Sequence, residues 1–291
     1  MKSRYLINIL LIALVFSLYW FVNQEAPKQL QGQGLTATTH GDITKITILR
    51  DGLDTISIQK NASNWRLVHP INAPANNTRI KLLLSILNTN SHAQLSHADN
   101  ATQTQLGFND SSTILKLNED NFQFGNIESI SKRRYVLHND VIHLIDDNVA
   151  PLLNANAASF IDNKLIALNH QISKLSLPTL NTDQTLSTHT ITIEQKEGHW
   201  KSDNNKLSSD QLTILIDAWQ HAYALQVLPL STASVPASEP HNIVVWFQNQ
   251  TEPVELQLQQ DNRTLYLNSP SQQLSYQFPI ALLQQLLPIS P

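Results

Sequence analysis

An apolar run near the start of the chain constrains the protein more than any other feature of its sequence. Residues 5–22 read YLINILLIALVFSLYWFV and carry no charged side chain. A helix of this length rises about 27 Å, close to the thickness of the hydrocarbon core of a bilayer. The sequence holds no second stretch of comparable length. Residues 1–22 are therefore predicted to form a short stub and a single transmembrane helix.

The residues that flank this run favour an uncleaved anchor and predict its orientation. A signal peptide ends in small residues around its cleavage site, whereas this run ends in the aromatic residues 19–21 (YWF), which suit the membrane–water interface. Lys2 and Arg4 precede the run and Glu25 follows it. The positive-inside rule then places the N-terminus in the cytoplasm and the remaining chain outside that membrane. A cleaved signal peptide and a buried core helix are the alternatives.

Composition excludes several classes of function. Charged residues make up 14% of the chain and the net charge is −4, which does not suit nucleic-acid binding. The one basic cluster, Lys132, Arg133 and Arg134, is short; we expect a solvated start of a strand there, and it is the sole candidate contact with a partner. Cysteine is absent, which excludes thiol nucleophiles, cysteine-ligated zinc, disulfides and a lipidated cysteine. The absence fits a bacterial periplasmic domain.

The sequence contains an internal repeat. ITKITI at residues 43–48 is echoed by ISKLSL at 172–177, and TISI at 55–58 by TITI at 190–193. A tryptophan, Trp65 or Trp200, follows the second of these strands at the same distance in each half. Because the order of the elements is shared as well as their composition, we predict a duplication. The two tryptophans are expected to have a common role in the core.

A helix follows the tryptophan in each half, and short strands follow the helix. Apolar residues recur at helical spacing over 80–87 and again over 212–219, which predicts one buried stripe on each helix. Asn76, Asn77 or Thr78 can cap the first helix, and Ser208 with Gln211 forms a capping box for the second. Alternating patterns then predict strands and a short closing helix in each half. The predicted strands are 113–117, 121–124, 134–138 and 141–145, then 243–247, 254–258, 264–267 and 274–278, and the closing helices are 148–154 and 280–287.

The predicted fold class is α+β, with two tandem duplicated units behind one transmembrane helix. Each unit is an antiparallel sheet with one main packed helix. Residues 1–22 are the cytoplasmic stub and anchor, and residues 23–40 are a linker. Residues 41–166 form the first repeat, and residues 167–291 form a second, degenerate repeat.

Signatures of catalysis are missing from the sequence. The chain has seven glycines and no phosphate-binding loop, nucleophile elbow or H-E-x-x-H motif. The nearest approach to a metal site is the set of His138, His143, Asp146 and Asp147. These histidines flank a predicted hairpin turn, so we expect hydrogen-bonded or half-exposed strand residues there instead of ligands. The sequence predicts no catalytic residue, no metal and no cofactor.

Several motifs of the first half resemble a known family. The pattern ITKITI, then TISIQK and NWRL, a short helix and Leu106-Gly107-Phe108 is similar to the bacterial family called domain of unknown function 4340. Phe124-Gly125-Asn126 and the strands 134–137 and 141–145 continue the resemblance, which covers about residues 43–165, and the second half lacks the two glycine motifs. The resemblance implies an N-terminal membrane anchor and a place beside ABC-type transporters related to gliding-motility exporters. It assigns no catalytic residue.

Three hypotheses for function follow. The first is a non-catalytic accessory or scaffold protein, anchored by a single pass in the bacterial inner membrane, which binds a protein partner of the membrane or periplasm. The second is a periplasmic module that binds or senses a ligand in a pocket between two lobes. The third, an envelope hydrolase, is disfavoured because no nucleophile or metal motif supports it.

Overall fold

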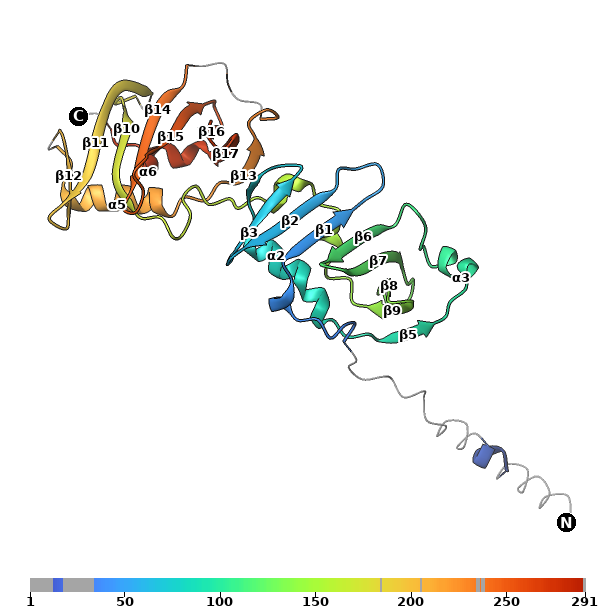
Figure 1. Ribbon diagram of the computed structural model, residues 1–291. Coiled ribbons are helices and arrows are strands. Elements are labelled where there is room, and N and C mark those ends of the chain that lie inside the picture. Colours follow the sequence, from blue (N-terminus) through green and yellow to red (C-terminus); the bar gives the residue numbers. More distant parts are fainter. Residues whose placement is uncertain are drawn as a thin grey trace, which may run out of the picture. The chain divides into compact units, whose positions relative to one another are not determined.

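Two antiparallel β-sheets make up most of the protein, which has few helices (Figure 1). The computed structural model describes residues 13–17, 34–183, 185–204, 206–233, 236 and 239–289. All strand pairs of named strands in this part of the chain are antiparallel. The predicted α+β class, with antiparallel sheets, is confirmed.

The first sheet has nine strands in the order β4-β3-β2-β1-β6-β7-β8-β9-β5. Its strands are β1 (Lys45–Leu49), β2 (Ile56–Asn61), β3 (Asn64–His69), β4 (Ala73–Pro74), β5 (Ala93–Ser96), β6 (Thr113–Leu117), β7 (Asp120–Ile127), β8 (Arg134–His138) and β9 (Val141–Ile145). The helical segments of this part are η1 (His40–Asp42), α2 (Asn77–Leu84), η2 (Ser85–Asn88), α3 (Asn100–Gln105), α4 (Ala150–Leu153) and η3 (Ala157–Phe160).

The second sheet has eight strands in the order β12-β11-β10-β14-β15-β16-β17-β13. Its strands are β10 (Ile172–Leu180), β11 (Leu186–Lys196), β12 (His199–Ser202), β13 (Gln226–Pro229), β14 (His241–Phe247), β15 (Val254–Gln260), β16 (Thr264–Ser269) and β17 (Leu274–Pro279). Its helical segments are α5 (Ser209–Gln220), η4 (Ile280–Leu282) and α6 (Leu283–Leu286).

The two sheets have the same strand order once β4 is set aside. β1, β2 and β3 correspond to β10, β11 and β12, β6–β9 correspond to β14–β17, and β5 corresponds to β13. The main helix also occupies the same place in the chain, since α2 precedes β5 and α5 precedes β13. A duplicated chain would have this organisation. The predicted boundary at residues 166/167 falls between the last strand of the first sheet and the first strand of the second.

The chain forms two compact units, and their boundaries differ from those of the two sheets. The first unit comprises the described residues up to Thr55 together with Lys81–Leu153, and the second comprises Ile56–Ile80 with the described residues from Asn154 onward. The first unit thus contains β1 and β5–β9. The second contains β2–β4 and the whole second sheet.

Only residues 13–17 of the predicted anchor are described, and they are helical with exposed side chains. The rest of residues 1–22, and residues 23–33 of the predicted linker, lie outside the described residues. Within the described ranges, no helix has both the length and the apolar character that crossing a membrane requires. At the end of the predicted linker, Gly34 forms a β-bridge with Asn90 and the Thr38 hydroxyl donates a hydrogen bond to Asp120 Oδ2 at 2.7 Å. These contacts join residues 34–38 to the first unit.

The core of the first unit follows from strict alternation along its strands. Ile46 and Ile48 of β1 are fully buried and lie directly opposite Leu117 and Leu115 of β6, which are also fully buried. Alternate side chains of a strand point to opposite faces, so one face of the sheet becomes apolar. Each fully buried aliphatic side chain contributes about 1.5–3 kcal/mol relative to an exposed one.

The core of the second unit is built in the same way and is closed by α5. Leu175 of β10 pairs with Ile193 of β11 and with Val245 of β14, and all three are buried. The apolar stripe predicted for residues 212–219 is confirmed, because all four of its apolar residues are buried. Trp219 is 0% exposed, and its indole N–H donates a hydrogen bond to the carbonyl oxygen of Leu286 in α6 at 2.7 Å. The helix begins at the predicted capping box of Ser208 and Gln211.

Candidate functional site

The basic cluster predicted as a partner contact lies in the loop between β7 and β8 and at the start of β8. Arg134 Nη2 lies 2.8 Å from Asp147 Oδ2, and its Nη1 donates to the Gly125 carbonyl oxygen at 2.7 Å. The side chains of Arg134 and Asp147 are only 18% and 17% exposed. This arginine is therefore paired within the protein, with a carboxylate and with a carbonyl oxygen.

The other two basic residues are more accessible. Arg133 Nε lies 3.2 Å from Asp146 Oδ1, and these two side chains are 34% and 57% exposed. Lys132 adopts a positive φ of 61° and forms no ion pair within the described residues. Of the three predicted contact residues, Lys132 is thus the one whose charge is presented to solvent by the loop.

Glu128 fixes the shape of this loop. Its carboxylate accepts hydrogen bonds from the backbone N–H of Ile130 at 2.9 Å and from the backbone N–H and the hydroxyl of Ser131, the latter at 2.6 Å. The Ser131 hydroxyl and these backbone donors, with a smaller effect of the Lys132 charge, lower the pKa of Glu128 to about 2. The loop holds Ile130 outward, with 89% of its surface exposed, and Ile127, the last residue of β7, is 50% exposed.

The histidines that came nearest to a metal site are buried and hydrogen-bonded. The His138 ring is 2% exposed, stacks on Phe122 with ring centroids 4.4 Å apart, and bonds through Nδ1 to the Asn121 carbonyl oxygen. The His143 ring bonds through Nδ1 to the hydroxyl of Ser91 at 3.1 Å. Burial, and then the neighbouring His138, lower the pKa of His143. In the described part of the chain, no three His, Asp or Glu residues are placed to hold a metal ion.

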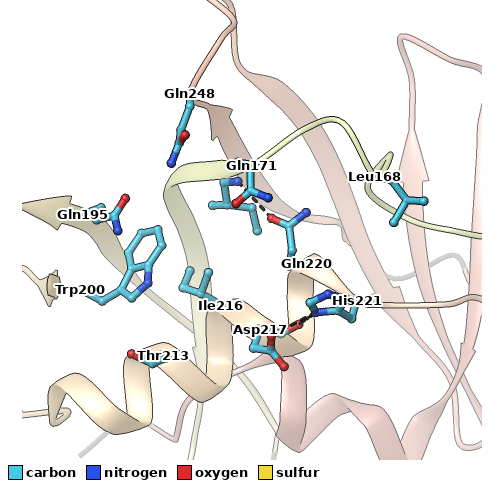
Figure 2. Close-up of a pocket in the computed structure, with 11 residues that line it drawn as sticks. Leu168, Gln171, Gln195, Trp200, Thr213, Ile216, Asp217, Gln220, His221 and Gln248 are labelled. Atoms are coloured by element: carbon cyan, nitrogen blue, oxygen red, sulfur yellow. Dashed lines mark hydrogen bonds and ion pairs between the residues drawn. The ribbon is translucent and has the colours of Figure 1, made fainter. Parts of the chain in front are cut away.

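A cavity of about 310 Å³ lies in the second unit, beside α5, and sequence reasoning missed it. Strands β10, β11 and β12, the residue that follows β14, and α5 supply its walls. Its lining comprises Leu168, Gln171, Ile172, Gln195, Trp200, Thr213, Ile216, Asp217, Gln220, His221 and Gln248. Figure 2 places Trp200 and Gln195 on one side of the cavity and Leu168 on the opposite side.

Three polar interactions hold the wall of the cavity that α5 supplies. Gln220 accepts a hydrogen bond from the backbone N–H of Ile172 at 3.1 Å and donates one to the His170 carbonyl oxygen at 2.7 Å. Asp217 Oδ1 lies 3.1 Å from His221 Nδ1, one helical turn further on. The side chains of Gln220, Asp217 and His221 are therefore already paired within the protein.

Trp65 and Trp200 do not have the predicted core role. Both side chains are only half-buried, on β3 and β12. Lys60 Nζ lies over the Trp65 ring at 5.8 Å from its centroid, while Trp200 lines the cavity. The prediction was wrong, since neither side chain is among the buried residues of the core. The tryptophan that fills the core of the second unit is Trp219, on α5, which the apolar stripe over 212–219 predicted.

The two glycine motifs of the first half meet in the structure, although α3 ends well before β7 begins. The backbone N–H of Asn126 donates to the Leu106 carbonyl oxygen at 2.7 Å. A Cβ on Gly125 would lie 2.5 Å from that same oxygen and 2.9 Å from the Phe108 ring. A Cβ on Gly107, whose φ is +91°, would lie 2.8 Å from the backbone nitrogen of Asn126. Both positions therefore require glycine, since no other residue permits this approach.

The family model described as "Domain of unknown function (DUF4340)" matches residues 65–260. This chain belongs to the DUF4340 family. The match includes both glycine motifs, and it runs from β3 to the end of β15. The match thus begins later than the span of 43–165 predicted from the resemblance, leaving out the motifs at 43–60, and it ends further along the chain, so that it includes strands of both sheets. No curated protein and no solved structure matches the chain.

Proposed function

We propose that this protein is a non-catalytic accessory or scaffold subunit of the bacterial envelope. Residues 5–22 anchor it in the inner membrane, with the N-terminus in the cytoplasm and the folded units in the periplasm. There it binds a protein subunit of a membrane complex, of the ABC-type or gliding-type class that the family resemblance implies. The two sheets are duplicated repeats, a proposal supported by their common strand order.

The observation that carries the proposal is the rigid, apolar tip of the β7–β8 loop. An isoleucine that is 89% exposed is costly to keep in water. Here the Glu128 carboxylate fixes the backbone on either side of it with three hydrogen bonds. A contact residue held in one conformation loses little entropy when a partner binds. Ile130 with Ile127 and Lys132 therefore forms a small apolar and cationic contact, which we call the β7–β8 tip.

The use of the carboxylates supports a non-catalytic role. Hydrogen bonds within caps and turns lower the pKa of Asp42, Asp99, Asp183 and Asp261. General acid–base catalysis near neutral pH works best with a group whose pKa lies near that pH. Carboxylates held in the ionised form by their own turns instead stabilise the backbone.

Co-purification tests the partner. The tagged full chain, extracted from membranes in a mild detergent, should bring down a membrane subunit in fixed proportion. Ile130→Asp should abolish this recovery, because it places a second negative charge at the tip beside Glu128. Leu53→Asp is the matched control, since Leu53 is an exposed apolar residue in another turn. Recovery of the wild-type chain alone, or equal loss in both variants, would contradict the proposal.

Fractionation tests the anchor separately. The full chain should stay in the membrane pellet after an alkaline carbonate wash, and protease added to spheroplasts should digest its folded units. Replacing residues 5–22 with a cleavable signal peptide should release the folded units into the periplasmic fraction. Wild-type chain in the soluble fraction, with its first residues removed, would argue against the anchor.

A further inference from the structure

We propose that the cavity beside α5 binds one unit of a neutral carbohydrate, with Trp200 as the stacking surface and glutamine side chains as the hydrogen-bonding groups. This site goes beyond the accessory role and does not depend on it. The cavity of about 310 Å³ lies at the lower end of the size range of small-molecule sites. It can hold a single sugar ring, while its open side leaves room for the rest of a chain.

Three glutamine side chains that line the cavity are unpaired. Across the described residues, the amides of Gln171, Gln195 and Gln248 form no hydrogen bond with another part of the protein, whereas Gln220 uses both ends of its amide. A primary amide offers two donor hydrogens and an acceptor oxygen. A sugar hydroxyl also donates and accepts, so these three amides match a ring that carries several hydroxyl groups.

The charges on the cavity wall disfavour small anions. The lining contains no lysine or arginine, so a phosphate or carboxylate would find no cation to pair with. The ionisable residues of the lining, Asp217 and His221, are paired with each other at 3.1 Å. The cavity is therefore best suited to an uncharged polar molecule.

Trp200 gives the cavity an apolar side that a purely polar site would lack. Trp200 is half-buried on β12, and the buried Ile216 and Ile172 also line the cavity. One face of a pyranose ring is made of C–H groups, which pack against a flat aromatic surface. An aromatic surface together with several amides offers such a ring both apolar and hydrogen-bonding contacts. Figure 2 shows the Trp200 ring beside Gln195, with the side chains of Gln171 and Gln248 further along the cavity.

The rim of the cavity is held in place before any ligand arrives. The backbone N–H of Gln248 donates to the Gln171 carbonyl oxygen at 2.9 Å, which joins the two segments that carry these amides. Gln220 joins α5 to the start of β10. A preformed site avoids the cost of ordering its walls on binding.

Titration of the purified full chain with neutral trisaccharides tests this site. The probes are maltotriose, cellotriose and triacetylchitotriose. Their binding is measured by calorimetry and by tryptophan fluorescence. The detergent must lack a sugar headgroup, because such a headgroup would compete for the cavity. At least one probe should bind, with a change in fluorescence. Titration to about 10 mM detects even a millimolar Kd.

Variants connect the binding to the cavity. Trp200→Ala should weaken binding about tenfold, and Gln195→Ala, which removes one exposed amide, about fivefold. Trp65→Ala is the control, because Trp65 occupies the corresponding strand β3 but does not line the cavity. Binding that survives Trp200→Ala and Gln195→Ala would overturn the proposal. A lack of binding by all three probes would also overturn it. Trigalacturonate, which is charged, and trialanine, a peptide, are the comparison ligands, and binding of either one without binding of any neutral saccharide would overturn it too.

The result is independent of the partner experiment. Saccharide binding is measured on the isolated chain, and co-purification is measured with Ile130→Asp, whose β7–β8 tip belongs to the other unit. Failure of one proposal can therefore be told from failure of the other.

Discussion

The backbone N–H of Asn126 donates a hydrogen bond to the carbonyl oxygen of Leu106 at 2.7 Å. This bond joins the end of α3 to β7 at the point where the register with β8 shifts, between Phe124 and Ile127. The glycines of both motifs permit the approach, so the motifs that carry the family resemblance have a structural role. They allow the end of α3 to pack against β7 close to the start of the β7–β8 loop.

Gly125→Ala should destabilise the protein by about 1–3 kcal/mol. The added methyl would lie 2.5 Å from the Leu106 carbonyl oxygen, and a backbone atom cannot move aside as a flexible side chain can. Gly41→Ala is the control, because its Cβ would meet no atom closer than 3.7 Å. Urea denaturation of both variants measures the difference. Equal midpoints for the two would show that the close approach has no energetic importance.

Gly107→Ala should destabilise the protein by more than the strain of a left-handed backbone conformation alone. Its φ is +91° and its Cβ would lie 2.8 Å from the backbone nitrogen of Asn126. Gly198→Ala is matched for backbone, with φ of +79° and nothing within 4 Å, so it should lose only about 1–2 kcal/mol. Thermal unfolding compares the two. A smaller loss for Gly107→Ala than for Gly198→Ala would contradict the prediction.

The hydrogen bonds of Glu128 should make stability depend on pH in the acid range. The pKa of Glu128 is lowered from 4.5 to about 2, so its contribution to stability is complete above pH 4.5 and is lost as pH falls toward 2. Glu128→Gln should therefore differ most from the wild type above pH 4.5, and the two urea midpoints should converge below it. Glu252→Gln, at an exposed position in another turn, should show no such convergence. A constant difference at all pH values would refute the role given to Glu128.

Because His143 is buried, the protein should become less stable as the pH falls below the ordinary pKa of a histidine. Its pKa is lowered from 6.5 in the folded state, so below pH 6.5 the unfolded chain binds the proton more readily than the folded protein does. Stability is thus complete above pH 6.5 and decreases as pH falls through the lowered pKa. His143→Gln should reduce this decrease, and His189→Gln, at an exposed position, should not. Denaturation curves between pH 8 and pH 5 measure both slopes.

The two arginines of the basic cluster should differ in their contributions to stability. Arg134 pairs with Asp147 in a largely buried site, and Arg134→Gln leaves that carboxylate without its partner. The expected loss is about 1–3 kcal/mol, between the values for exposed and for fully buried ion pairs. Arg133→Gln, whose partner Asp146 is exposed, should lose less than about 1 kcal/mol. Urea denaturation measures both losses. Similar losses of stability for the two variants would contradict the prediction that the buried ion pair contributes more than the exposed one.

Local patterns determined the secondary structure well. The predicted bounds of β6, β8 and β9 agree with the structure residue for residue, because alternation of apolar and polar side chains directly records the two faces of a strand. The capping box of Ser208 and Gln211 was also predictable, since its hydrogen bonds join residues only three positions apart.

The sequence by itself thus determined the antiparallel α+β class, the helix stripes and the family, all of which depend on spacing within short segments. Tertiary structure alone decided that Trp65 and Trp200 stay half-buried, and it alone formed the Arg134–Asp147 pair and the cavity beside α5. The cavity combines Gln171, Gln195 and Gln248, which come from three separate parts of the chain. No local pattern records such a meeting, because side chains distant in sequence are brought together only when the sheet and its helix pack.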